Sequence, residues 1–205
     1  KPENNLIPDA VLDKHRAELV IDRVENINRE TQQLALESGE RVGYQRLIIA
    51  TGSAPMMAPI PGFDKENVFA IMKDVNFLSK LQNVLKGADK LVIVGGGFIG
   101  VEFADECNKA YDLGVSIVEM LPHCLMLAYD EEFCEMAESL LNERGIQTLT
   151  SRKVDHFGGA GAVDSVVFAD GETVEADAVI VAIGTTPNVE LAERLLKEHA
   201  LELSA

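Results

Sequence analysis

An apolar run that stops at three glycines constrains this chain more than any other feature. Residues 91–94 read Leu-Val-Ile-Val, which is typical of a buried strand, and a helical pattern begins at Phe98. Between them stands a G-x-G-x-x-G sequence made by Gly95, Gly97 and Gly100. The first glycine of such a loop makes a tight turn, the second lets the backbone approach a pyrophosphate, and the third lets helix and strand pack closely. The loop therefore predicts a dinucleotide site facing the N–H groups that begin the helix.

An acidic residue ends the next apolar run. Residues 115–118 predict a second strand, and Glu119 follows it at the distance where a carboxylate can bind a ribose hydroxyl. The same charge would repel the 2′-phosphate of NADP, and residues 120–128 hold no arginine, His123 being the only base. We therefore predict NADH over NADPH. The alternative, a glycine turn between buried elements, leaves the placement of Glu119 to chance.

Charge and composition narrow the class of partner. With 34 acidic residues against 18 basic ones the net charge is −16, which argues against nucleic acid or an anionic membrane as a partner. No apolar run approaches the length of a membrane span. We expect a small-molecule coenzyme as the partner and a cytoplasmic location. Cys107, Cys124 and Cys134 lack C-x-x-C spacing and are expected to be core residues, and the scattered histidines predict no metal site.

The remaining patterns alternate between helix and strand. Short runs between residues 18 and 42, beginning at Leu19 and Ile21, predict an antiparallel meander. The continuous apolar run at 47–50 predicts a parallel strand covered on both faces. Helices are predicted over 74–85, from Phe98 to about Ala110, and from a cap at Asp130 to Gly145; three short strands and a final strand at 179–184 follow. The third helix is expected to bury an apolar stripe made of Phe133, Met136, Ala137, Leu140 and Leu141.

An internal repeat links the two ends of the chain. Residues 39–55 align without gaps onto 171–187 at a constant offset of 132, with seven identities in seventeen positions. The identities include two glycine pairs, Gly39 with Gly171 and Gly52 with Gly184. Such self-similarity predicts two related halves. A twin of the glycine loop would precede Lys1, so we expect this chain to be the end of one dinucleotide domain and most of a second, taken from a longer protein.

Three motifs resemble those of the pyridine nucleotide-disulfide oxidoreductases, the FAD- and NAD(P)-dependent flavoenzymes related to NADH oxidase, coenzyme A disulfide reductase and ferredoxin reductase. The motifs are Ala50-Thr51-Gly52, the segment 94–102 and the segment 182–188. The resemblance implies an α/β fold, with a Rossmann-like three-layer β/β/α dinucleotide-binding domain preceded by the partial second half of a related FAD-binding domain. The implied bounds are 1–58 for the partial FAD-binding domain, 59–88 for a connector and helix, 89–188 for the NAD-binding domain, and 189–205 for a return segment.

The resemblance also implies roles for individual residues. Gly95, Gly97 and Gly100, with Ile99 beside them, would hold the NAD pyrophosphate, and Glu119 the adenosine ribose. Phe98 occupies the family's aromatic gate over the flavin, unless it is an apolar core residue. Glu102 matches the acid at the nicotinamide end, unless it only complements the helix dipole. The remaining implied contacts are made by Ile183 and Gly184 on the nicotinamide side and by Thr51 and Gly52 beside FAD.

The resemblance implies that the parent enzyme passes hydride from NADH to flavin and on to oxygen, a disulfide or another acceptor. Its redox cysteine would precede residue 1, so we expect no catalytic residue in this chain and no activity from it alone. The parent is expected to be a homodimer. Two alternatives stay open: a stand-alone NAD-binding module with no reaction of its own, and a reductase that serves a ferredoxin or rubredoxin.

Overall fold

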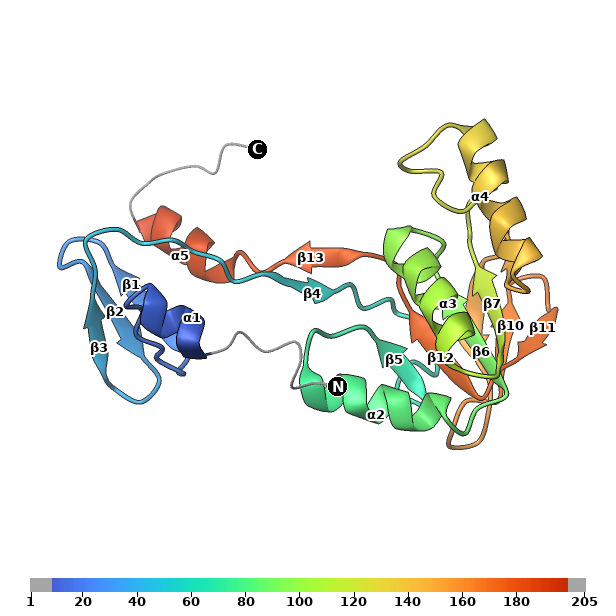
Figure 1. The fold of residues 1–205 in the computed structure, drawn as a ribbon, viewed down its shortest axis with the longest axis horizontal. Helices are drawn as coiled ribbons and strands as arrows, with labels where there is room; N and C mark the ends of the chain where they lie inside the picture. Colours follow the sequence, from blue (N-terminus) through green and yellow to red (C-terminus); the bar gives the residue numbers. More distant parts are fainter. Residues whose placement is uncertain (1–8, 199–205) are drawn as a thin grey trace. The chain divides into compact units, whose positions relative to one another are not determined.

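The computed structural model describes residues 9–198 (Figure 1). The chain divides into two compact units. The central unit is Ala54–Thr186, and the outer unit combines the residues up to Ser53 with those from Pro187 onward. The chain therefore leaves the outer unit once, builds the central unit and returns.

A five-stranded parallel sheet forms the middle of the central unit, in the order β5-β12-β6-β7-β8. Its strands are β5 (Val68–Ala70), β6 (Lys90–Val94), β7 (Gly114–Val118), β8 (Gln147–Leu149) and β12 (Ala178–Val181). The three inner strands are apolar runs because a parallel sheet covered on both faces has no wet side.

Successive residues of β6 serve opposite faces of this sheet. Leu91 and Ile93 pack in the cluster with helices α2 (Val75–Leu85), α3 (Phe98–Ala110) and α4 (Glu131–Glu143). Val92 and Val94 pack on a three-stranded antiparallel sheet made of β9 (Val154–Phe157), β10 (Ser165–Phe168) and β11 (Thr173–Glu175). This alternation follows from the two-residue period of a strand. The central unit is thus a three-layer β/β/α structure, as predicted.

Local signals set the helix limits in this unit. Asp74 caps α2, because its carboxylate accepts a hydrogen bond from the Phe77 N–H at 2.8 Å. Asp130 is the N-cap residue of α4, but its side chain makes no capping hydrogen bond. Gly145, with φ of +83°, follows the end of α4 in the left-handed conformation that favours glycine. The three predicted helices are confirmed within a residue or two at each end.

The outer unit contains an antiparallel sheet and two helices. The sheet has the order β1-β2-β3, from β1 (Val24–Asn28), β2 (Gln33–Leu36) and β3 (Arg41–Gly43). Helix α1 (Asp9–Lys14) precedes it, and α5 (Glu190–Glu198) lies against β1. Strands β4 (Ser53–Pro55) and β13 (Thr185–Pro187) pair where the chain passes between the units.

The sequence repeat is also a repeat of structure. The pairs β2 and β10, β3 and β11, and β4 and β13 each begin 132 residues apart. Gly39 and Gly171 adopt nearly the same left-handed conformation, with φ of +87° and +86°. The sheets β1-β2-β3 and β9-β10-β11 also share one connection order. The two matched hairpins therefore fold alike.

Two strand predictions in the outer unit are wrong. Residues 47–50 are not a strand among the described residues, and Ile48 is 88% exposed. Their counterpart in the repeat lies largely in β12, which is hydrogen-bonded to neighbours on both sides. The run at Leu19 and Ile21 is also outside any strand and exposed, since the meander begins at Val24. An apolar run becomes a strand only when a partner satisfies its backbone groups.

The buried face of α4 also differs from the prediction. Of the predicted stripe, Leu141 is buried and Ala137 is half-buried, but Phe133, Met136 and Leu140 are each more than half exposed. Cys134, outside the predicted stripe, is buried instead. The helix is therefore turned so that its side with Cys134 and Leu141 faces the core, and α4 lies against β8. A helix with apolar residues on two adjacent stripes does not specify which one faces the core.

No helix among residues 9–198 combines the length and the apolar character that crossing a membrane requires.

Candidate dinucleotide-binding site

The glycine loop lies at the point where the sheet reverses its order. From β6 the chain proceeds through β7 to β8 on one side, while β12 and β5 lie on the other. Gly95 follows β6 with φ of +110°, and a Cβ on it would lie 2.5 Å from the Ala182 carbonyl oxygen at the end of β12. The carboxyl end of a parallel sheet at such a reversal is where ligands bind in open α/β folds.

Gly100 and Gly97 differ in the space around them: a side chain at Gly100 would clash, whereas the space at Gly97 is open. A Cβ on Gly100 would lie 1.9 Å from the Gly95 carbonyl oxygen, so α3 can approach the loop only without a side chain there. A Cβ on Gly97 would meet nothing within 4 Å. Gly97 therefore leaves open space in front of the helix, which is the space that a bound pyrophosphate would need.

The first turn of α3 points its backbone donors at that space. Gly97 is the N-cap residue and makes no side-chain capping bond. The first intrahelical bond beyond it runs from the Val101 N–H to the Gly97 carbonyl at 3.0 Å. The N–H groups of Phe98, Ile99 and Gly100 precede it and have no acceptor within the helix. Together with the helix dipole, such N–H groups are suited to an anion.

Glu119 touches the glycine loop directly. Its Oε2 accepts a hydrogen bond from the Gly96 N–H at 2.6 Å, and its Oε1 accepts one from the Leu121 N–H at 2.8 Å. Each carboxylate oxygen can accept more than one hydrogen bond, so the side chain retains capacity for a ribose hydroxyl. The structure thus brings Glu119 into contact with the glycine loop at Gly96.

Phe98 and Glu102 stand on the exposed side of α3. Phe98 is 59% exposed, and its ring meets the Tyr129 ring edge-to-face, with centroids 5.8 Å apart. The interpretation of Phe98 as a core residue is therefore wrong. Both side chains line a groove of ≈ 420 Å³ between α3 and α4, with Val101, Leu125 and Leu140.

The four remaining predicted residues are divided between the units. Ile183 follows Ala182 beside Gly95, and Gly184 has φ of +120°. Thr51 and Gly52 belong to the outer unit, where both contact Asn188. The Thr51 hydroxyl donates to the Asn188 carbonyl at 2.5 Å, and the Asn188 amides donate back to the carbonyls of Thr51 and Gly52, each at 2.9 Å. Asn188 lies in the motif segment 182–188, but sequence reasoning missed this reciprocal pairing.

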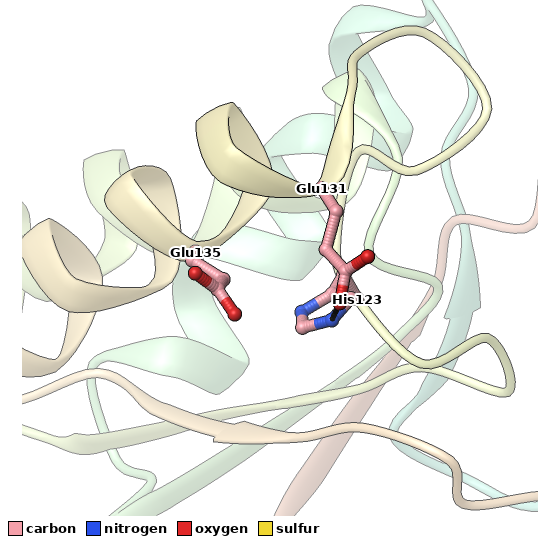
Figure 2. Close-up of side chains that lie close together, drawn as sticks. All are labelled: His123, Glu131 and Glu135. Atoms are coloured by element: carbon pink, nitrogen blue, oxygen red, sulfur yellow. Dashed lines mark ion pairs between the residues drawn. The ribbon is translucent and has the colours of Figure 1, made fainter.

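Sequence reasoning also missed a cluster of one imidazole and three acids. The His123 Nδ1 lies 3.2 Å from the Glu138 Oε2, and its Nε2 lies 3.6 Å from the Glu131 Oε1. Figure 2 shows Glu131 and Glu135 on α4 on the side where His123 lies, and the ligand atoms of these three residues fall within 4.8 Å of one another. The spacing of the acids, which puts them on one helix face, is the signal that could have found the cluster.

Ion pairing explains this cluster. The hydrogen bond with Glu138, assisted by the charges of Glu138, Glu131 and Glu135, raises the pKa of His123. The raised pKa favours the imidazolium form, in which both ring nitrogens carry protons. The ion pairs of His123 with Glu138 and Glu131 account for the grouping of these side chains.

The cysteines are buried and free, as predicted for core residues. Burial raises the pKa of Cys124 to about 12 and that of Cys107 to about 11. Burial likewise raises the pKa of Cys134. The thiolate is the reactive form of cysteine, so none of the three is suited to redox catalysis at neutral pH.

The parallel sheet, the glycine loop and the acid at the end of β7 define a Rossmann-like dinucleotide-binding protein. Comparison with known proteins gives the family. The chain belongs to the pyridine nucleotide-disulphide oxidoreductase family, whose family model matches residues 7–203.

The relatives include oxidases and reductases. The chain is 32% identical over 177 residues to an NADH oxidase of Methanocaldococcus jannaschii, covering 85% of this chain and 39% of that protein. It is 34% identical over 194 residues to an NADH oxidase of Enterococcus faecalis, covering 88% of this chain and 42% of that protein. The chain thus spans less than half the length of these relatives.

Solved structures agree in fold. A ferredoxin reductase from Rhodopseudomonas palustris superposes with a TM-score of 0.85 at 29% identity, over 93% of this chain and 48% of that one. A FAD-dependent pyridine nucleotide-disulphide oxidoreductase from Desulfovibrio vulgaris gives 0.75 at 28% identity, over 94% and 49%. The predicted α/β fold class is confirmed, as are a pyridine nucleotide and FAD as the cofactors of the family.

Proposed function

We propose that the central unit binds NADH, with the pyrophosphate at the start of α3 and the adenosine ribose at Glu119. The observation that carries the proposal is the contrast between Gly100, which is closed against Gly95, and Gly97, which is open. The hydrogen bond between Glu119 and Gly96 supports it, because it places a ribose acceptor beside the phosphate donors. Phe98, Glu102, Ile183 and Gly184 would lie toward the nicotinamide, and Thr51 and Gly52 beside FAD.

In this proposal the central unit contains the NAD-binding domain, and the outer unit belongs to a FAD-binding domain. When bound, NADH supplies a hydride and FAD accepts it. The chain's own contribution is to hold the coenzyme. The donors of α3 would stabilise the pyrophosphate charge and Glu119 would orient the ribose. The exposed ring of Phe98 lines the groove beside Glu102.

For the whole protein we propose a flavin-dependent NADH oxidoreductase that passes electrons to oxygen, a disulfide or another acceptor. A ferredoxin is the second candidate acceptor. It is favoured by a relative named as the ferredoxin–NAD(+) reductase component of the biphenyl dioxygenase system of Paraburkholderia xenovorans, 32% identical over 83% of this chain. Assays of NADH consumption with oxygen, with small disulfides and with a ferredoxin separate these acceptors.

Binding by this chain is the direct test. NADH fluorescence should titrate saturably, and ADP-ribose should compete because it carries the pyrophosphate and the adenosine ribose. Nicotinamide mononucleotide lacks both features and should compete only at far higher concentration. A flat NADH titration, or competition by the mononucleotide alone, would contradict the proposal.

A further inference from the structure

We propose that Glu138 of α4 is a positioning residue for the coenzyme loop, acting through Cys124 on Gly96. This inference rests on the proposed function, since it concerns the same dinucleotide site. Glu138 lies on a helix outside the G-x-G-x-x-G sequence, and it would act without touching the coenzyme.

The segment 119–125 follows β7. Glu138 binds this segment near its C-terminal end, at Cys124. The Glu138 Oε1 accepts a hydrogen bond from the Cys124 N–H at 2.7 Å. Its other oxygen faces the His123 Nδ1 at 3.2 Å. The side chains of Glu138 and His123 are 15% and 19% exposed, so both contacts are shielded from water. Hydrogen bonds to a shielded carboxylate are among the stronger ones in proteins.

Cys124 and the adjacent Leu125 both contact Gly96. The Leu125 N–H donates to the Gly96 carbonyl at 2.8 Å. The Cys124 sulfur packs against the same glycine, since a Cβ on Gly96 would lie 2.7 Å from it. The Gly96 N–H donates to Glu119 at 2.6 Å. The backbone N–H and the backbone carbonyl of Gly96 are therefore both hydrogen-bonded to the segment 119–125.

The contacts of Gly96 affect the backbone N–H donors at the start of α3. Gly96 precedes Gly97, and the position of its peptide sets where the open space and the free N–H groups lie. Releasing Cys124 would loosen the Leu125 bond and the packing under Gly96 together. A binding site depends on such support, because small displacements of donors weaken ligand binding.

The test compares Glu138→Ala, Glu138→Gln and the control Glu143→Ala, which removes an exposed charge from the same helix. NADH affinity is measured by fluorescence at about pH 8, above the ordinary pKa of histidine, and at the same pH for every variant. Glu138→Ala should weaken binding about tenfold, the loss expected for a charge-assisted hydrogen bond. Glu138→Gln keeps an oxygen for the Cys124 N–H and should stay within about threefold of the parent chain. Glu143→Ala should bind NADH like the parent chain.

Amide hydrogen exchange without coenzyme gives an independent readout. Glu138→Ala should speed exchange at Gly96, Cys124 and Leu125 and leave the amides of β10 protected. Unchanged NADH affinity in Glu138→Ala would overturn the inference. So would faster exchange throughout the core, because the variant would then act on overall stability. If the parent chain fails to bind NADH, the proposed function itself is overturned, and the coenzyme role of Glu138 with it.

Discussion

The carboxylate of Glu119 and the N–H of Gly96 are joined by a 2.6 Å hydrogen bond. The bond ties the residue expected to bind the adenosine ribose to the loop expected to bind the pyrophosphate. The two halves of the candidate site are therefore one hydrogen-bonded unit. Substitutions in either half should affect coenzyme binding, and the loop glycines and Glu119 offer ways to separate binding from folding.

Removing the Glu119 carboxylate should weaken NADH binding. Glu119→Ala loses a charge-assisted hydrogen bond to the ribose, which predicts a loss of about 1.5–3 kcal/mol in binding free energy. Calorimetric titration with NADH measures it, with Glu143→Ala as a control for lost charge. A dissociation constant equal to that of the parent chain would remove Glu119 from the site.

The coenzyme preference follows from the same charge. A 2′-phosphate at the ribose would meet the Glu119 carboxylate, and NADH should bind at least about tenfold more tightly than NADPH, a difference of about 1.4 kcal/mol. Parallel titrations at one ionic strength compare the two coenzymes. Equal affinities, or tighter NADPH binding, would refute the assignment.

Two glycine-to-alanine substitutions should have opposite effects, one on NADH binding and the other on the stability of the fold. Gly97→Ala adds a methyl group in open space at φ of −76°, so thermal stability should change little while NADH binding falls about tenfold or more. Gly100→Ala places a methyl group 1.9 Å from the Gly95 carbonyl and should destabilise the fold by about 1–3 kcal/mol. Thermal unfolding and NADH titration of both variants give the comparison. A stable Gly100→Ala protein, or a Gly97→Ala protein with full affinity, would contradict this reading of the loop.

His123 should make stability depend on pH. Its pKa in the folded chain is raised above the ordinary value of 6.5 by Glu138 and the neighbouring acids. Protonation therefore stabilises the folded state; this contribution is complete below the ordinary value and is lost as pH rises through the raised one. His123→Gln should lower the thermal midpoint more at about pH 5.5 than at about pH 8.5, where the ring is less protonated. His15 is exposed, and His15→Gln serves as the control. If His123→Gln lowered the thermal midpoint equally at both pH values, His123 would not be the source of a pH-dependent stability.

The three thiols should be unreactive in the folded chain. Cys124 and Cys107 have pKa values raised to about 12 and about 11 by burial, and Cys134 is also buried. A chromogenic disulfide reagent at about pH 8 should label them slowly in the native state and all at once after denaturation, because the thiolate is the attacking form. Rapid native labelling would show that the interior around these residues opens readily.

Much of the central unit follows from the sequence. The run at 91–94, the glycines after it and the pattern of α3 agree on one strand–loop–helix unit, and the structure has it at β6 and α3. Such a unit is readable because its constraints act between residues close in sequence, where glycine alone allows a left-handed turn or a close helix approach. The offset of 132 likewise determined that β3 and β11 would match.

Only the tertiary structure decided which residues pair and which face is buried. Residues 47–50 have the pattern of a buried strand yet form none among the described residues, since hydrogen-bonded neighbours are what make a strand. The stripe of α4 that faces the core is set by the packing of the helix against β8. The contact of Glu138 with Cys124 joins residues fourteen apart through side-chain geometry. The sequence by itself thus determined the strand–loop–helix unit, because its constraints are local, and the fold decided the support around it, because that support depends on distant segments meeting.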